Sequence, residues 1–63
     1  MPTNTEITNA LNEWCHNARH REATRIRMTD GLSYGEIADR MHVDERTAKR
    51  YVQRGKASIE GHI

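Results

Sequence analysis

The sequence predicts a small all-α fold of about four helices, on three observations. The only proline is Pro2, so no proline interrupts a helix in the interior of the chain. Apolar residues recur at helical spacing, without the alternation that marks a strand. Thr, Ser and Asp stand where helices need N-caps. With 63 residues, 35% of them hydrophobic, the chain has room for one domain with a thin core.

The first helix is expected over about residues 4–16. Thr3-Asn4-Thr5-Glu6 has the form of a capping box, in which the hydroxyl and the Glu carboxylate satisfy backbone N–H groups at the helix start. The apolar residues that follow at spacings of four, three and four share one face: Ile7, Leu11, Trp14 and Ala18. This frame fails between His16 and His20, because Ala23 and Ile26 fall on another face. Either the first helix ends there, or one long helix turns a different face to a different neighbour. We favour a second helix over about 19–29, with Asp30-Gly31 ending it.

Two shorter patterns predict the rest of the fold. Ser33-Tyr34-Gly35-Glu36 is a second capping box and starts a helix of about 34–41. His42-Val43 makes a tight turn, Asp44 caps a last helix of about 45–54, and Gly55 ends it. The domain thus divides into an N-terminal helix at 4–18, a trihelical core at 19–54 and a tail at 55–63. Residues expected to be largely buried in the trihelical core are Ala23, Ile26, Leu32, Ile37, Ala38, Met41, Val43, Ala48, Tyr51 and Val52.

The last helix has a polar outer face, although the net charge of the chain is only +1. At about 100° per residue, Lys49, Arg50 and Gln53 lie within about 60° of Arg46, while the apolar residues lie opposite. Residues 45–56 hold five Lys and Arg against one Glu, and residues 16–27 hold four Arg against one Glu. These two basic patches suit an anionic partner. The alternative is an ordinary solvated helix face.

Two short helices joined by three or four residues form the plan of a helix-turn-helix. The segment from Gly31 to Val52 resembles the helix-turn-helix of bacterial and phage repressors, recombinase tails and sigma factor region 4. The resemblance lies in the GLSY.EIA entry, in Ala38 at the helix contact, and in Val43 and Ala48 after the turn. One departure is His42, which stands where the family usually has Gly for a positive φ. His is among the residues enriched in that conformation, so the turn is expected to form with some strain.

The resemblance implies a second helix that enters the DNA major groove, where Arg pairs with guanine and Gln with adenine. The residues expected to contact DNA are Arg46, Lys49, Arg50, Gln53, Arg54, Tyr34 and Thr47. Tentative phosphate contacts are Arg21, Arg25 and Lys56, although the arginines of residues 19–27 have pairing with Glu22 and nearby acids as the alternative. Asp44 is expected to act as a cap, and Glu45 is a candidate acceptor from cytosine.

Other kinds of site find little support in the sequence. Cys15, His16 and His20 lack a fourth zinc ligand, and Cys15 points about 100° away from His16. No nucleophile with its base, acid–base pair or phosphate-binding glycine loop is recognisable. No metal, cofactor, small-molecule ligand or catalytic activity is therefore expected. Without a membrane span or signal peptide, and with one cysteine, the expected location is cytoplasmic.

The leading functional hypothesis is a small phage or prokaryotic transcriptional regulator, a repressor that acts by occupying an operator. One alternative is an excisionase-like factor or the DNA-binding module of a recombinase or transposase. Another is a protein-interaction adaptor, which the basic outer helix disfavours because docking faces carry apolar or aromatic anchors. The stripe of Ile7, Leu11 and Trp14 either packs on its own domain or forms a homodimer that sets two recognition helices about 34 Å apart.

Overall fold

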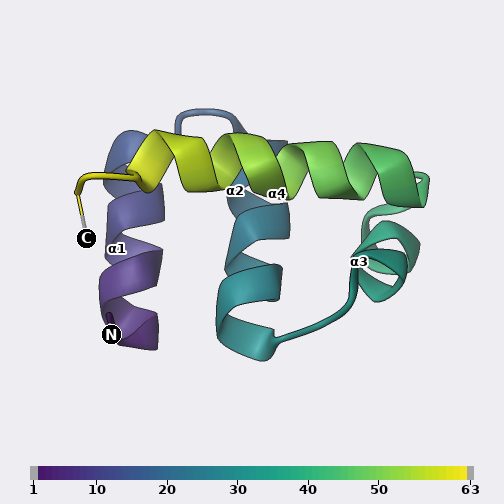
Figure 1. Cartoon of the computed structure of the whole chain (residues 1–63), viewed down its shortest axis with the longest axis horizontal. Helices are drawn as coiled ribbons and strands as arrows, with labels where there is room; N and C mark the ends of the chain where they lie inside the picture. The colour runs from purple at the N-terminus through teal and green to yellow at the C-terminus, as the bar shows by residue number, and fades with distance from the viewer. Residues whose placement is uncertain (1, 63) are drawn as a thin grey trace.

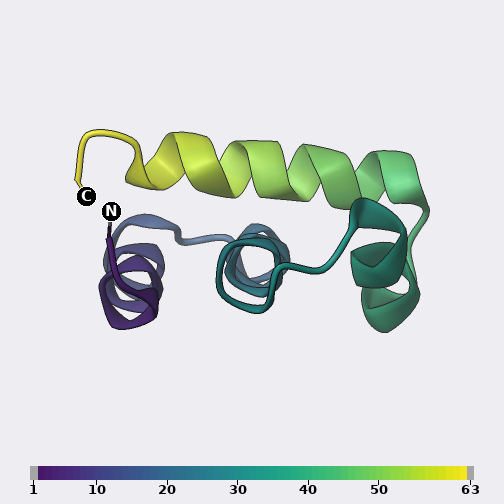
Figure 2. The ribbon, with the colours of Figure 1, turned by 60° about the horizontal axis from the view of Figure 1, so that its bottom comes forward.

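The computed structural model describes residues 2–62 and confirms the all-α fold class. The helices are α1 (Asn4–Trp14), α2 (Ala18–Arg25), α3 (Tyr34–Met41) and α4 (Glu45–Ile59), and a π-helical turn, η1 (Ile26–Asp30), extends α2. Helix α4 forms one layer and lies across the other three helices, which form the second layer (Figures 1 and 2). The longest helix therefore connects all parts of the domain.

The predicted caps are present at the helix starts. The Thr3 hydroxyl accepts from the Glu6 N–H at 3.1 Å, and the Ser33 hydroxyl accepts from the Glu36 N–H at 3.3 Å, each within a complete capping box. The break between α1 and α2 was expected but not its cap. The Asn17 side chain accepts from the backbone N–H groups of Arg19 and His20, at 3.0 and 3.1 Å. Local polar side chains therefore set where these helices begin.

The first core cluster holds the helix-turn-helix together. Its fully buried members are Ala23, Ile26, Ile37, Ala38, Ala48 and Val52, and Leu32, Tyr34, Met41, Val43 and Tyr51 pack against it as half-buried residues. All ten predicted core residues thus belong to this cluster or its margin. Leu32, Met41, Val43 and Tyr51 are less buried than expected. Their margin positions follow from the small size of the domain, which leaves few residues to cover them.

A second core cluster joins the two ends of the chain. Ile7, Ala10, Leu11 and Cys15 pack with Ile59, and Met28 of η1 covers them. The predicted end of the last helix at Gly55 is wrong, because α4 continues to Ile59. Burying Ile59 against α1 stabilises this extra turn, which the sequence pattern of the tail did not reveal.

Gly55 lies inside α4 because α2 and α4 cross closely there. A Cβ at this position would lie 2.9 Å from the His20 carbonyl oxygen and would overlap the Thr24 hydroxyl. Thr24 is completely buried, and its hydroxyl lies 2.7 Å from the His20 carbonyl oxygen and 3.3 Å from that of Val52. The missing side chain of Gly55 thus provides the space in which Thr24 fits.

The apolar stripe of α1 packs on its own domain. Ile7 and Leu11 are 6% and 1% exposed, whereas Trp14 is 43% exposed and stacks on His62 with ring centroids 3.9 Å apart. Ile7 and Leu11 are therefore unavailable for the homodimer interface to which they were assigned. Burial against Ile59, which lay in the supposed tail, accounts for the difference.

Candidate nucleic-acid interface

The outer face of α4 gathers the charged and amide side chains that the sequence predicts there. Arg46, Lys49, Arg50 and Gln53 are all exposed, and together with Glu45 they line one shallow hollow on the surface. The opposite face of the same helix carries Ala48 and Val52, both fully buried. The core contacts of the inner face thus fix which side chains point outward.

The N-terminus of α4 is capped by Asp44, as expected. Its carboxylate accepts from the Thr47 backbone N–H at 2.9 Å. Hydrogen bonds from the Thr47 hydroxyl and backbone, assisted by the charge of Arg46, lower the pKa of Asp44. The carboxylate therefore stays ionised near neutral pH and serves the helix. Thr47, a predicted DNA contact, lies half-buried at this cap.

The turn between α3 and α4 has the conformation that the resemblance requires. His42 is left-handed, with φ 58° and ψ 43°, and it is the non-glycine residue with positive φ among residues 2–62. Its backbone N–H donates to the Ala38 carbonyl, and so does that of Val43, at 3.0 Å. The turn thus forms without glycine, at the strain cost of a left-handed residue that carries a side chain.

Tyr34, another predicted DNA contact, also has a structural role. Its ring packs against the first core cluster, and the Arg27 guanidinium lies over it at 4.8 Å from the ring centroid. Arg27 also donates to the Leu32 carbonyl at 2.8 Å. These two contacts of Arg27 hold the connection between η1 and α3 in place. The sequence did not predict this role of Arg27, because the role depends on the carbonyl group of a loop residue.

The three tentative phosphate contacts are not among the residues that line the shallow hollow on α4. Arg25 pairs with Glu22 at 2.7 Å, and this hydrogen bond raises the pKa of Arg25. Arg21 donates to the Cys15 carbonyl at 3.3 Å. Lys56 lies on the opposite flank of α4 from Arg54, beside Ile7 and Met28. The alternative reading of the arginines, pairing within the chain, thus applies to Arg25.

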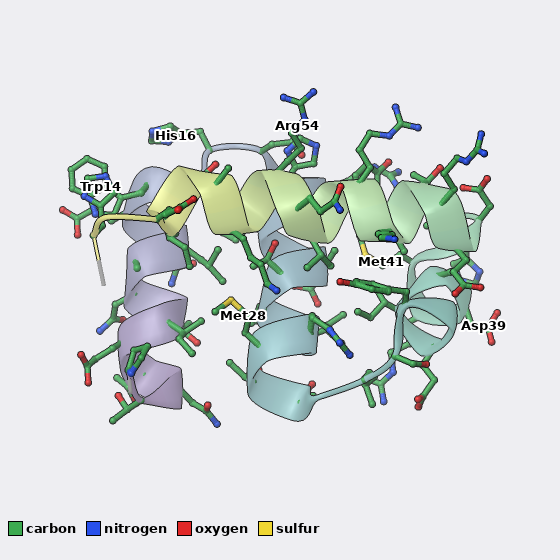
Figure 3. The ribbon with its side chains drawn as sticks, viewed as in Figure 1. Trp14, His16, Met28, Asp39, Met41 and Arg54 are labelled. Atoms are coloured by element: carbon green, nitrogen blue, oxygen red, sulfur yellow. The ribbon has the colours of Figure 1, made fainter. Side chains whose placement is uncertain are left out.

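Arg54 extends the basic surface beyond the shallow hollow. It is exposed and projects from α4 on the same side of the molecule as His16, which belongs to the connection between α1 and α2 (Figure 3). His20 lies under this surface, with its ring 5.3 Å from that of Tyr51. The sequence predicts a helix break between His16 and His20, and the structure has one, since α1 ends at Trp14 and α2 begins at Ala18.

Residues 2–62 contain neither a metal-binding cluster nor a membrane-spanning helix. No group of three or more His, Cys, Asp or Glu side chains is arranged to hold a metal ion. None of the helices has both the length and the apolar character needed to cross a bilayer.

Comparison with known families matches this geometry. The model of sigma-70, region 4 matches residues 18–59, which include α2, η1, α3 and α4 but leave α1 outside. Curated proteins and solved structures gave no significant match. The matched part comprises the first core cluster, the left-handed turn and the basic outer helix. The chain belongs to the sigma-70 region 4 family of helix-turn-helix DNA-binding domains.

Proposed function

We propose that this protein is a sequence-specific DNA-binding regulator that inserts the outer face of α4 into the major groove. The observation that carries the proposal is the exposure of Arg46, Lys49, Arg50 and Gln53 on one side of a helix whose other side is locked in the core. From Arg46 to Ile59 the helix contains no acidic residue. A face with three cationic side chains and one carboxylate, that of Glu45 at its N-terminal end, suits the negatively charged groove of DNA.

The roles within this face follow from side-chain chemistry. Arg50 and Gln53 are assigned to base edges, because Arg pairs with guanine and Gln with adenine through two hydrogen bonds. Arg46 and Lys49 flank them and contact bases or phosphates. Arg54 lies farther along the helix and contacts the phosphate backbone. Tyr34 and Thr47 contribute mainly through the parts of their side chains that the core and the cap leave exposed.

The regulator acts by occupancy. Residues 2–62 consist of the DNA-binding helices and of helix α1, which packs against them. The action open to this part of the protein is to cover a DNA site that another protein needs. Placed over a promoter, an occupied site lowers transcription. Placed upstream of it, the same site has no such effect if occlusion is the mechanism, and that contrast tests occlusion as the mode of repression.

The experiment is selection of binding sites from random duplex DNA, followed by titration of the selected site at fixed salt. Arg50→Ala and Gln53→Ala should each weaken binding by about 5-fold to 150-fold, the equivalent of about 1 to 3 kcal/mol, and should relax the sequence preference. Asn12→Ala, an exposed amide on α1, is the matched control for Gln53→Ala and should bind as the wild type does. No enrichment of any sequence would contradict the proposal and favour the interaction adaptor.

The homodimer remains a prediction, and fewer of the residues assigned to its interface now support it. Of the three residues assigned to it, only Trp14 has an exposed surface to offer a second copy. A selected site with two-fold repeated halves would support a dimer on DNA. Sedimentation of the wild type and Trp14→Ala at tens of micromolar tests the free protein, and a monomer in both cases removes the constitutive dimer.

A further inference from the structure

The basic row on α4 does not run straight along the helix. Arg46, Arg50 and Arg54 are spaced four residues apart, and each step of four turns the side chain by about 40° around the axis. Over two steps the row therefore moves about 80°, toward the flank that carries Tyr51. Arg54 thus faces the edge of the outer surface rather than its middle.

The N-terminal end of α2 lies along this same flank. The His20 ring is 5.3 Å from the Tyr51 ring, and the Thr24 hydroxyl is 3.4 Å from the Tyr51 carbonyl oxygen. Gly55 follows directly after Arg54, and a Cβ there would lie 2.9 Å from the His20 carbonyl oxygen. The first turn of α2 therefore lies beside Tyr51 and Gly55 of α4, on the flank toward which Arg54 is turned.

The connection carries side chains to the DNA side of the molecule. It passes along the upper edge of α4 in Figure 1, and His16 and Arg54 both extend upward from the ribbon in Figure 3. Arg19 stands in the first turn of α2, where side chains lean toward the N-terminus of a helix, and it is exposed. Within residues 2–62, Arg19 makes no side-chain hydrogen bond or ion pair, unlike Arg21 and Arg25.

The charge of this edge favours an anion. Residues 14–21 contain no acidic residue, and neither do residues 46–59. Asn17 accepts from the backbone N–H groups of Arg19 and His20, so the backbone donors at this helix start are already used. Recognition at this edge therefore depends on the side chains.

We propose that His16 and Arg19, together with Arg54, form a second contact to DNA, which holds the phosphates of one strand beside the groove read by α4. The contact rests on the proposed function, since it adds a phosphate clamp to the same complex. It replaces Arg21, Arg25 and Lys56 as the source of sequence-independent affinity. It also extends the footprint of the protein in one direction only, past the C-terminal half of α4.

The salt dependence of binding tests this contact, measured on the selected duplex with the full chain. Loss of one phosphate contact lowers the slope of log K against log salt by about 0.9 in B-DNA. Arg19→Ala and Arg54→Ala should each show that decrease with the order of preferred sequences unchanged. His16→Ala should also weaken binding to all sequences by a common factor, because a phosphate contact carries no sequence information.

Two variants test the competing assignment of the phosphate contacts to Lys56 and Arg25. Lys56→Ala removes one charge from the opposite flank of α4, and Arg25→Ala removes one from the helix that carries Arg19. Both should keep the wild-type salt slope. Removing the base pairs that flank the site on one side should weaken the wild type but leave the His16→Ala, Arg19→Ala double variant nearly unaffected.

The outcomes separate this contact from the proposed function. An unchanged salt slope for Arg19→Ala and Arg54→Ala, combined with lost preference in Arg50→Ala, would overturn the second contact and leave base reading by α4 intact. A decreased salt slope in Lys56→Ala and Arg25→Ala, with an unchanged slope in Arg19→Ala and Arg54→Ala, would also overturn the second contact. It would assign the phosphate contacts to Lys56 and Arg25 instead. A wild type that binds no duplex would contradict both proposals.

Discussion

The two core clusters of this domain differ in how their residues are spaced along the chain. The first cluster draws on residues 23–52, with a cap or turn at each helix boundary. The second cluster pairs residues 7–15 with Ile59, about 45 or more positions away. Helix α4 belongs to both, and Gly55 lies between them. The contrast shows that one helix carries the proposed DNA-contact face at its N-terminal half and packs against α1 at its C-terminal end.

The largest expected effect is the loss of the first cluster in Ile37→Ala. Ile37 is completely buried at the centre of the helix-turn-helix. The substitution leaves a cavity and should lower the free energy of unfolding by about 2 to 5 kcal/mol. In a domain of this size such a loss consumes much of the total stability. Urea unfolding followed by circular dichroism measures it, and a change below about 1 kcal/mol would show that the first cluster is not the main core.

Ile59→Ala is the corresponding side-chain truncation in the second cluster. The residue is 2% exposed, but it is the last residue of α4, where the structure can relax more easily. We expect the free energy of unfolding to fall by about 2 kcal/mol, which is at the lower end for such truncations. Hydrogen exchange should show α1 opening before α3. Equal loss of protection in both helices would mean that the two clusters unfold as one unit.

Gly55→Ala tests the crossing that separates the clusters. Alanine favours a helix over glycine by about 1 kcal/mol, so a solvent-exposed site would gain stability. Here the new methyl group overlaps Thr24 and approaches the His20 carbonyl, and overpacking of this kind costs about 1 to 3 kcal/mol. We expect the free energy of unfolding to fall by up to about 2 kcal/mol, and by less when Thr24→Ala is added. A more stable Gly55→Ala would show that α2 and α4 separate at little cost.

These clusters also mark what the sequence could and could not predict. Capping boxes at Thr3 and Ser33 and the Asp44 cap are local signals, because the hydrogen-bonding partners lie three residues apart. The outer face of α4 followed from its inner face by helical periodicity alone. Gly55 misled the prediction because glycine ends helices and also permits close crossings, and only the position of Thr24 distinguishes the two roles.

The site was partly predictable for the same reason. Arg46, Lys49, Arg50 and Gln53 lie together because they share one helix face. The relation between Arg54 and His16 depends on how α2 crosses α4, which no local pattern encodes. Arg25 illustrates the opposite case, since pairing with Glu22 was one of the two roles that the sequence left open, and the i, i+3 spacing lets the pair form within one helix.

A smaller effect is expected at the turn that leads into α4. The left-handed conformation of His42 costs free energy that glycine would not lose. Glycine, in turn, increases the conformational entropy of the unfolded chain, which lowers stability. We expect His42→Gly to stabilise the domain by about 0.5 to 1 kcal/mol, which raises Tm by a few degrees in a chain of this size. His42→Ala should instead lower Tm. A lower Tm for His42→Gly would mean that the His42 side chain contributes contacts that outweigh the strain.

The smallest effect concerns the pH dependence of the Asp44 cap. The pKa of Asp44 lies below its ordinary value, because Thr47 donates to the ionised carboxylate. A carboxyl group with a lowered pKa in the folded state stabilises the fold above the unfolded pKa of about 3.9, and this stabilisation disappears as the pH falls through the folded pKa. Asp44→Asn is the control, since asparagine caps a helix but does not titrate in this range. The stability of the wild type relative to Asp44→Asn, measured by urea unfolding, should therefore be constant from pH 7 to about 5 and should decrease from pH 4 to pH 3. A difference that is the same at pH 3 and pH 7 would show that the carboxylate charge contributes nothing to the start of the recognition helix.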